Sequence, residues 1–121
     1  VKEMIAEMVS DYDAARLLWL RAGWLKNQGR RNTRETSVAK WFATVKSERA
    51  ASDCVQIHGG NGFSDEYPAG RFYRNSKAAV IYEGTSQIHT LMQAGYALNE
   101  RHDRPMRREL PAYDPAYWEA E

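Results

Sequence analysis

The chain has 121 residues and a net charge of +1, from 17 Lys and Arg against 16 Asp and Glu. This length gives one small domain, and the near-balanced charge provides no strong field for holding nucleic acid or an anionic membrane. No apolar stretch reaches the roughly 20 residues of a membrane-spanning helix, and the single cysteine, Cys54, excludes a disulfide framework and favours a reducing, cytoplasmic setting.

Residues 1–28 predict one long helix. No proline interrupts this segment, and its apolar residues recur every three or four positions; they are Val1, Met4, Ile5, Met8, Val9, Tyr12, Ala15, Trp19 and Ala22. Gly29 is the expected stop, because glycine adopts the left-handed backbone of a helix C-terminus without strain. The three- to four-residue spacing of apolar residues already includes Val1, so we expect the chain to begin inside a helix of a longer polypeptide.

A second helix is predicted from Asn32 to His58. Asn32 is the candidate N-cap, and Glu35 follows three residues later in the spacing of a capping box. The glycine-rich run at 59–62 cannot continue the helix cheaply and should end it. The short connection between the two helices predicts an antiparallel hairpin.

The rest of the bundle is predicted to hold two shorter helices. One covers residues 69–77, and a turn at 83–86 leads into the last helix, which ends at Leu98. Either Thr85 or Ser86 can cap this last helix through its hydroxyl group. We expect four apolar residues of the last helix to face inward: Ile88, Leu91, Met92 and Ala94.

Residues 99–121 contain three prolines and four arginines, which predicts an extended tail. No strand-like alternation persists anywhere in the sequence. The predicted fold class is therefore all-α, with an antiparallel helical bundle over residues 1–98 followed by the tail at 99–121.

Two segments contain residues suited to binding or catalysis. Residues 56–60 read Gln-Ile-His-Gly-Gly, and such glycines either form a helix C-terminal turn or let the backbone approach a phosphate closely. Glu83 lies between an apolar run and a helix start, where a carboxylate either complements the helix dipole or, held away from water, acts as a base. The histidines lack the spacing of metal ligands, so no metal site is predicted.

Together the two segments resemble the acyl-CoA dehydrogenase family. The shared pattern is Gln56-x-x-Gly59-Gly60-x-Gly62-Phe63-x-x-Glu66-Tyr67-Pro68, then Arg74, then Ile81-Tyr82-Glu83-Gly84-Thr85-Ser86-Gln87-Ile88. The resemblance extends back through both long helices and covers residues 1–98. It implies most of a C-terminal four-helix bundle, with the first helix of that bundle, which carries a flavin-contacting arginine, lying before Val1.

The resemblance also implies roles for individual residues. Glu83 would be the base that removes the α-proton of an acyl-CoA, giving a trans-2-enoyl-CoA, and Gly84 would lie against the substrate. The residues implied in FAD binding are Gln56, Ile57, His58, Gly59, Gly60, Thr85, Ser86 and Gln87. Residues 56–60 would reach the FAD of a neighbouring subunit in a homo-oligomer, a dimer or tetramer, and electron-transfer flavoprotein is the implied electron acceptor.

Two alternatives stay open at this stage. One is a non-catalytic helical module that serves only subunit assembly, which the family domains missing from this sequence favour. The other is a dehydrogenase for dicarboxylic, glutaryl-type, or ring acyl-CoA substrates, because the segments that build the acyl pocket lie largely outside this sequence. The intact Glu83-Gly84-Thr85 element favours a catalytic role over pure assembly.

Overall fold

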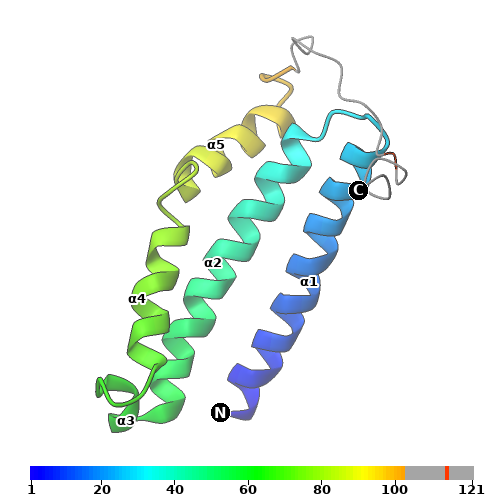
Figure 1. Ribbon diagram of the computed structural model, residues 1–121. Coiled ribbons are helices and arrows are strands. Elements are labelled where there is room, and N and C mark those ends of the chain that lie inside the picture. The colour runs from blue at the N-terminus through cyan, green and yellow to red at the C-terminus, as the bar shows by residue number, and fades with distance from the viewer. Residues whose placement is uncertain (103–113, 115–121) are drawn as a thin grey trace.

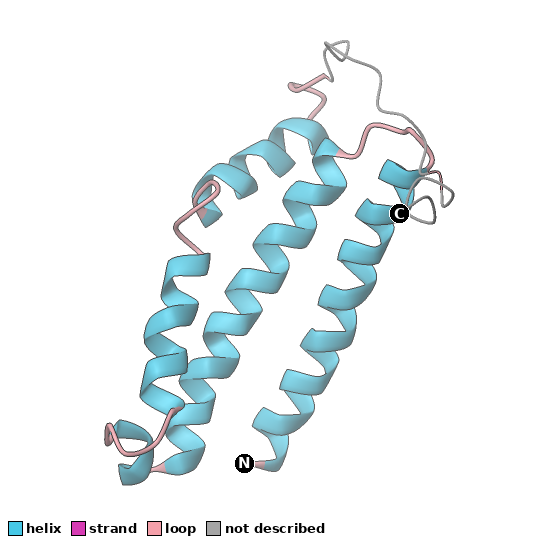
Figure 2. Cartoon of the chain, viewed as in Figure 1, coloured by secondary structure: helices cyan, strands magenta, loops and turns pink. Residues whose placement is uncertain are grey.

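A computed structural model describes residues 1–102 and 114, and every regular element in them is a helix (Figure 2). In chain order the helices are α1 (Lys2–Asn27), α2 (Thr33–His58), α3 (Gly60–Phe63), α4 (Ala69–Ala79) and α5 (Ser86–Ala97). The all-α prediction is confirmed. The division into a bundle at 1–98 and an extended tail at 99–121 stays a prediction, because 103–113 and 115–121 lie outside the described residues.

The two long helices form the antiparallel hairpin that the sequence predicts (Figure 1). α1 ends where expected, with Gly29 at φ 67° in the left-handed region. The Gly29 N–H donates to the Lys26 carbonyl and the Arg30 N–H to the Leu25 carbonyl, each at 2.9 Å. This pair of bonds is a Schellman motif, which satisfies carbonyl groups that the helix end leaves without partners.

The capping box predicted at the start of α2 does not form. Asn32 is the N-cap residue, but its side chain makes no capping bond and its amide donates to the Ala22 carbonyl of α1 at 2.9 Å. Glu35 pairs across the hairpin with Arg21, at 3.6 Å, and with its neighbour Arg34, at 3.8 Å. Contacts between the two helices therefore replace the local cap.

α2 is the central helix of the described part of the chain. α1 lies along one side of it, and α3, α4 and α5 lie along the other (Figure 1). Among the described helices, α1 packs against α2 alone. The buried residues are few and mostly small: Ala22, Leu25, Ser37, Ala39, Ala69 and Val80. The helices thus stand in a row and do not enclose a large core.

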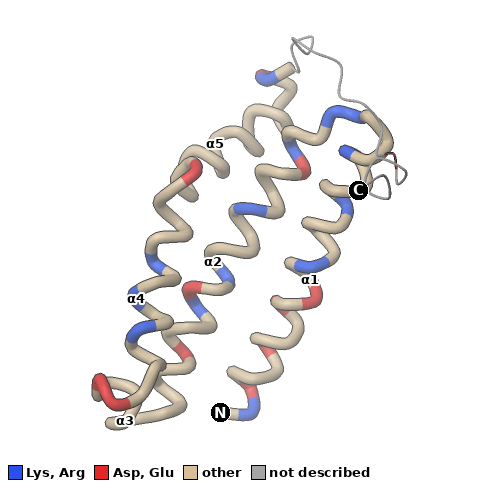
Figure 3. The backbone as a smooth tube through the Cα atoms, in the orientation of Figure 1, with Lys and Arg blue, Asp and Glu red and all other residues tan. Residues whose placement is uncertain are grey.

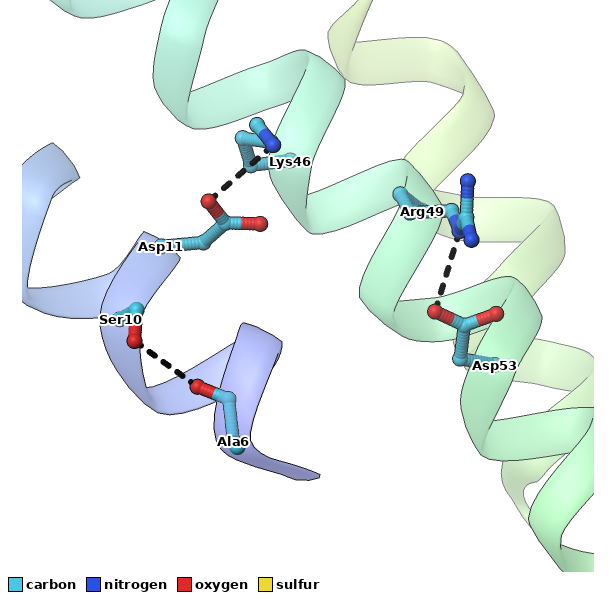
Figure 4. Close-up of polar contacts among 6 residues, drawn as sticks. All are labelled: Ala6, Ser10, Asp11, Lys46, Arg49 and Asp53. Atoms are coloured by element: carbon cyan, nitrogen blue, oxygen red, sulfur yellow. Dashed lines mark hydrogen bonds and ion pairs between the residues drawn. The ribbon is translucent and has the colours of Figure 1, made fainter. Parts of the chain in front are cut away.

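Ion pairs connect α2 to the helices on both sides, and charged residues occur along all three of these helices (Figure 3). Lys46 Nζ lies 3.1 Å from Asp11 Oδ1 of α1 (Figure 4), and Lys77 Nζ of α4 lies 2.7 Å from Glu48 Oε1. The hydrogen bond and the charge of Glu48 raise the pKa of Lys77 above its ordinary value. Such exposed pairs add little stability, but they fix which turns of α2 face each neighbour.

Large apolar side chains remain on the outside of α1. The exposed ones are Val1, Ile5, Val9, Tyr12, Leu17, Trp19, Leu20 and Trp24. Several of them recur at the three- and four-residue spacing of one helix face, the pattern of a helix that packs against a partner.

No helix of the described residues is long and apolar enough to cross a membrane.

The inward orientation predicted for α5 is wrong in this chain. Ile88 and Leu91 are 53% and 69% exposed, Ala94 is also exposed, and only Met92 is half-buried. The reason is that α5 packs on α2 alone among the described helices, so much of its apolar surface has no neighbour.

Residues 60–63 form a short helix that the sequence does not predict. Gly59 ends α2 as expected, at φ 58° and ψ −135°, a conformation that suits glycine. Gly62 is buried, and a Cβ atom there would collide with the carbonyl oxygen of Val55 on α2. Close packing of a glycine backbone on α2 holds α3, which local propensity alone would not form.

Candidate active site

Glu83 lies in the tight turn between α4 and α5. Its φ is 56° and that of Gly84 is 92°, so two successive residues adopt the left-handed region. For a residue other than glycine this conformation is uncommon and costs about 1–3 kcal/mol. It persists only where the surrounding structure holds the backbone in place.

Both carbonyl groups of this turn accept hydrogen bonds from side chains. Lys40 Nζ on α2 donates to the Gly84 carbonyl at 2.7 Å, and His89 Nε2 on α5 donates to the Glu83 carbonyl at 3.3 Å. Ser37, which is 3% exposed, places its Oγ 2.9 Å from His89 Nδ1. A Cβ on Gly84 would lie only 3.0 Å from His89 Nε2, so glycine leaves room for the ring.

The sequence pattern does not predict the contacts that Ser37, Lys40 and His89 make here. The available signal was weak: two polar residues three positions apart on a helix, and a histidine shortly after the predicted turn. Neither feature shows which segments lie side by side.

The turn passes directly into α5. Thr85 is the N-cap, and its Oγ1 accepts from the Ile88 N–H at 3.4 Å, which confirms the predicted cap. The backbone N–H and the hydroxyl of Ser86 both donate to the Val80 carbonyl, at 3.1 and 3.5 Å, and close the loop. Thr85 and Ser86 therefore have structural roles in the chain itself, whereas Gln87 is exposed.

The Glu83 side chain is exposed and forms no ion pair with any residue of 1–102. Exposed apolar residues surround it in sequence: Ile81 and Tyr82 are each 57% exposed, and Ile88 is 53% exposed. The described residues do not provide the water-poor setting expected of a base. They provide an exposed carboxylate that is close in sequence to exposed apolar residues, which a ligand with an apolar chain could cover.

The other predicted site residues lie toward the opposite end of α2. Gln56 stands 16 residues after Lys40, which corresponds to about 24 Å along a helix. Four of the five residues at 56–60 are exposed and Ile57 is half-buried. The His58 Nδ1 donates within its own helix, to the Cys54 carbonyl at 2.8 Å. One chain thus does not bring residues 56–60 together with the Glu83 turn.

Both groups of residues fit the FAD that the resemblance implies. Cβ atoms built on Gly59 and Gly60 would meet no atom within 4 Å, so the backbone there is open to close approach. The Gln56 and Gln87 amides are exposed, and the Thr85 hydroxyl retains a proton to donate. Within the described ranges, no cluster of three His, Cys, Asp or Glu residues is placed to bind a metal ion.

Sequence comparisons point to one family. The profile described as "Acyl-CoA dehydrogenase, C-terminal domain" matches residues 1–97. The chain is 42% identical over 90 residues to the probable acyl-CoA dehydrogenase YngJ of Bacillus subtilis, covering 74% of this chain and 24% of that protein. It is 38% identical over 97 residues to the caffeyl-CoA reductase-Etf complex subunit CarC of Acetobacterium woodii, covering 80% of this chain and 26% of CarC.

The fold gives the same result. The structure of butyryl-CoA dehydrogenase from Megasphaera elsdenii matches with a TM-score of 0.77 and 35% identity, over 80% of this chain and 25% of that one. The chain therefore spans about a quarter of the length of these relatives. Because the family profile matches residues 1–97 and the fold matches over 80% of the chain, this chain belongs to the acyl-CoA dehydrogenase family, where it corresponds to the C-terminal helical domain.

Proposed function

We propose that this chain supplies the catalytic base and part of the FAD site of an enzyme that oxidises an acyl-CoA to a trans-2-enoyl-CoA. The observation that supports this most is Glu83, an exposed carboxylate on a left-handed turn that is close in sequence to exposed Ile81 and Ile88. A glutamate that served only the helix dipole would gain nothing from a strained backbone. Backbone strain at an exposed carboxylate favours a functional role.

The proposed reaction breaks two C–H bonds of the substrate. Glu83 accepts the α-proton, and the electron pair of that bond forms the double bond between the α- and β-carbons as a hydride leaves the β-carbon. FAD, when bound, supplies the acceptor for this hydride. Gly84 has no side chain to obstruct the thioester beside the base. A bound acyl chain covers the turn and displaces water from the Glu83 carboxylate, which makes the carboxylate a stronger base.

Residues 56–60 and 85–87 are proposed to contact FAD from two different places. Their separation along α2 supports the idea that residues 56–60 serve the cofactor of a neighbouring subunit, because one chain does not unite the two groups. The exposed apolar side chains of α1 support association into a homo-oligomer.

Electron-transfer flavoprotein is the proposed electron acceptor. The support is the similarity to CarC, a subunit of a caffeyl-CoA reductase-Etf complex. Reoxidation of the substrate-reduced protein by purified electron-transfer flavoprotein tests the assignment. Failure of that step, with substrate reduction intact, would contradict the acceptor and leave the role of Glu83 in place.

Glu83→Gln in the FAD-loaded protein tests the central proposal. Gln keeps nearly the same size but cannot take the α-proton, so we expect the protein to fold, retain FAD and bind acyl-CoA. The rate of flavin bleaching by acyl-CoA without oxygen should fall by about 10²–10⁴-fold, the usual contribution of a general base. Glu7→Gln, at an exposed position on α1, is the matched control and should bleach at the wild-type rate.

A non-catalytic assembly module is the second candidate, because the exposed apolar residues of α1 alone would suit it. It predicts that Glu83→Gln leaves all redox behaviour unchanged. Wild-type bleaching by Glu83→Gln would overturn the catalytic proposal and favour this second one.

A further inference from the structure

One face of α2 holds two residues that are connected to the turn carrying Glu83, Lys40 directly and Ser37 through His89 of α5. Ser37 and Lys40 are three positions apart and therefore lie on the same side of the helix. Ser37 is almost completely buried and Lys40 is half-buried. Their partners are separated from them by 52 and 44 residues in sequence, His89 for Ser37 and Gly84 for Lys40. The central helix is thus connected to the turn by two routes, one through the Ser37–His89 pair and one through Lys40.

The chemistry of the partners assigns the protons along the first attachment. The Glu83 carbonyl can only accept, so the hydrogen of the neutral His89 ring lies on Nε2. The Nδ1 atom then carries a lone pair and accepts from the Ser37 hydroxyl, 2.9 Å away. In the opposite tautomer, lone pairs would face each other at the Glu83 carbonyl. The Glu83 carbonyl therefore selects the tautomer, and the Ser37 hydroxyl, which can donate or accept, donates to Nδ1 and holds the ring in place.

The second attachment is a hydrogen bond from a charged donor. Lys40 Nζ lies 2.7 Å from the Gly84 carbonyl oxygen, a short distance for a strong bond of this kind. Lys40 forms no ion pair with the Glu83 carboxylate, so its charge acts on the backbone and leaves the carboxylate without a cation among residues 1–102. Rotation of the peptide between Glu83 and Gly84 would change the direction of at least one held carbonyl.

We propose that Ser37, Lys40 and His89 are positioning residues that hold the left-handed Glu83–Gly84 backbone and so determine where the carboxylate points. The role rests on the proposed function of Glu83 as the base. These residues act through the backbone, so their loss should misplace the carboxylate while leaving folding and FAD binding intact. A displacement of 1 Å at a reacting group can reduce a rate by about 10²-fold.

Lys40→Met in the FAD-loaded protein tests the second attachment. It keeps the length of the side chain and removes the donor, so the rate of flavin bleaching at saturating acyl-CoA should fall by about 10- to 100-fold. KM should change by less than about threefold, because the loss falls on the chemical step. Lys40→Arg keeps a charged donor and should recover most of the rate.

Lys46→Met is the matched control for Lys40→Met. Lys46 lies on the same helix and is also half-buried, but it pairs with Asp11 of α1 and makes no contact with the turn. It should bleach at the wild-type rate. Thermal melting and FAD content of both variants separate a kinetic loss from a loss of folded protein.

His89→Leu and His89→Gln test the first attachment. Leu removes the bond to the Glu83 carbonyl, whereas the Gln amide can replace the Nε2 donor, so Gln should retain more of the rate than Leu. Lys40→Met is then combined with Glu83→Gln. A residue that acts only through the base should cause no further loss when the base is gone.

The outcomes separate the two proposals. If Glu83→Gln bleaches at the wild-type rate, the catalytic role of Glu83 is overturned and the positioning role with it. If Glu83→Gln is inactive but Lys40→Met and His89→Leu keep the wild-type rate, only the positioning role is overturned. Equal losses in Lys40→Met and Lys46→Met, or a further loss in the Glu83→Gln background, would also overturn it.

Discussion

Replacing Glu83 by glycine should stabilise the protein while it removes the proposed base. At φ 56° a residue with a Cβ pays about 1–2 kcal/mol for the left-handed conformation, and glycine does not. Glycine has more conformational freedom in the unfolded chain, which lowers the free energy of unfolding by about 0.5–1 kcal/mol and offsets part of this gain. The hydrogen bond from His89 uses the Glu83 backbone carbonyl and survives the substitution. The expected net change in the free energy of unfolding is therefore a gain of about 0–1.5 kcal/mol.

The measurement is urea unfolding followed by far-ultraviolet circular dichroism, on FAD-loaded wild-type, Glu83→Gly and Glu83→Gln proteins. Gln keeps the Cβ and the strain, so Glu83→Gln should unfold at the wild-type urea midpoint, and only Glu83→Gly should move to a higher one. Both variants should lose bleaching by acyl-CoA. This separation of stability from activity is expected where a strained conformation serves function.

A Glu83→Gly protein less stable than wild type, with FAD content unchanged, would refute this reasoning. It would mean that the Glu83 side chain stabilises the fold by more than its backbone strain costs. The argument from strain to a catalytic role would then no longer support Glu83 as the base. Equal shifts in Glu83→Gly and Glu83→Gln would also contradict it, because they would assign the effect to the lost charge.

Three further predictions concern packing, pH and association. Gly62→Ala should lower the free energy of unfolding by about 1–3 kcal/mol, because its Cβ would press on the Val55 carbonyl. Gly60→Ala is the control and should not lower it, because the space around Gly60 is open. Thermal melts of the two variants compare their stabilities. Glu48 raises the pKa of Lys77, so this pair's stabilisation is complete below the ordinary lysine pKa of 10.5 and is lost as pH rises through the higher folded value. Wild-type and Glu48→Gln unfolding midpoints should therefore differ at neutral pH and converge only in strongly alkaline solution. Trp19, at 57% exposure, lies on the uncovered face of α1, so residues 1–121 alone should self-associate, whereas sedimentation as a compact monomer that binds no hydrophobic dye would contradict this.

Helix ends were predictable where a single residue determines the backbone. Gly29 and Gly59 end α1 and α2 because both adopt positive φ values that other residues rarely take. Thr85 caps α5 through a bond to an N–H only three residues away. Such features depend on neighbouring residues in the chain, so the pattern of the sequence is enough to place them.

Features that depend on contact between distant segments were not predictable in the same way. The Asn32 side chain bonds to α1 and not to its own helix, because the hairpin brings the Ala22 carbonyl within reach. The short helix α3 exists because Gly62 packs closely on α2. In both places, local preference competes with a tertiary contact that the sequence does not display.

The same distinction between local sequence features and tertiary contacts applies to the candidate site. Glu83 and Gly84 are identified by a contiguous motif, because a base and the glycine beside it must occupy one tight turn. The residues that hold this turn are 44 and 52 positions apart from their partners in sequence, and no spacing rule connects Lys40 with Gly84 or Ser37 with His89. Only the packing of α5 and its preceding turn against α2 brings these groups within hydrogen-bond distance. The sequence thus determined which residue we propose as the proton acceptor. The tertiary structure decided how the backbone of that residue is held, because hydrogen bonds act over a few ångströms of space regardless of separation along the chain.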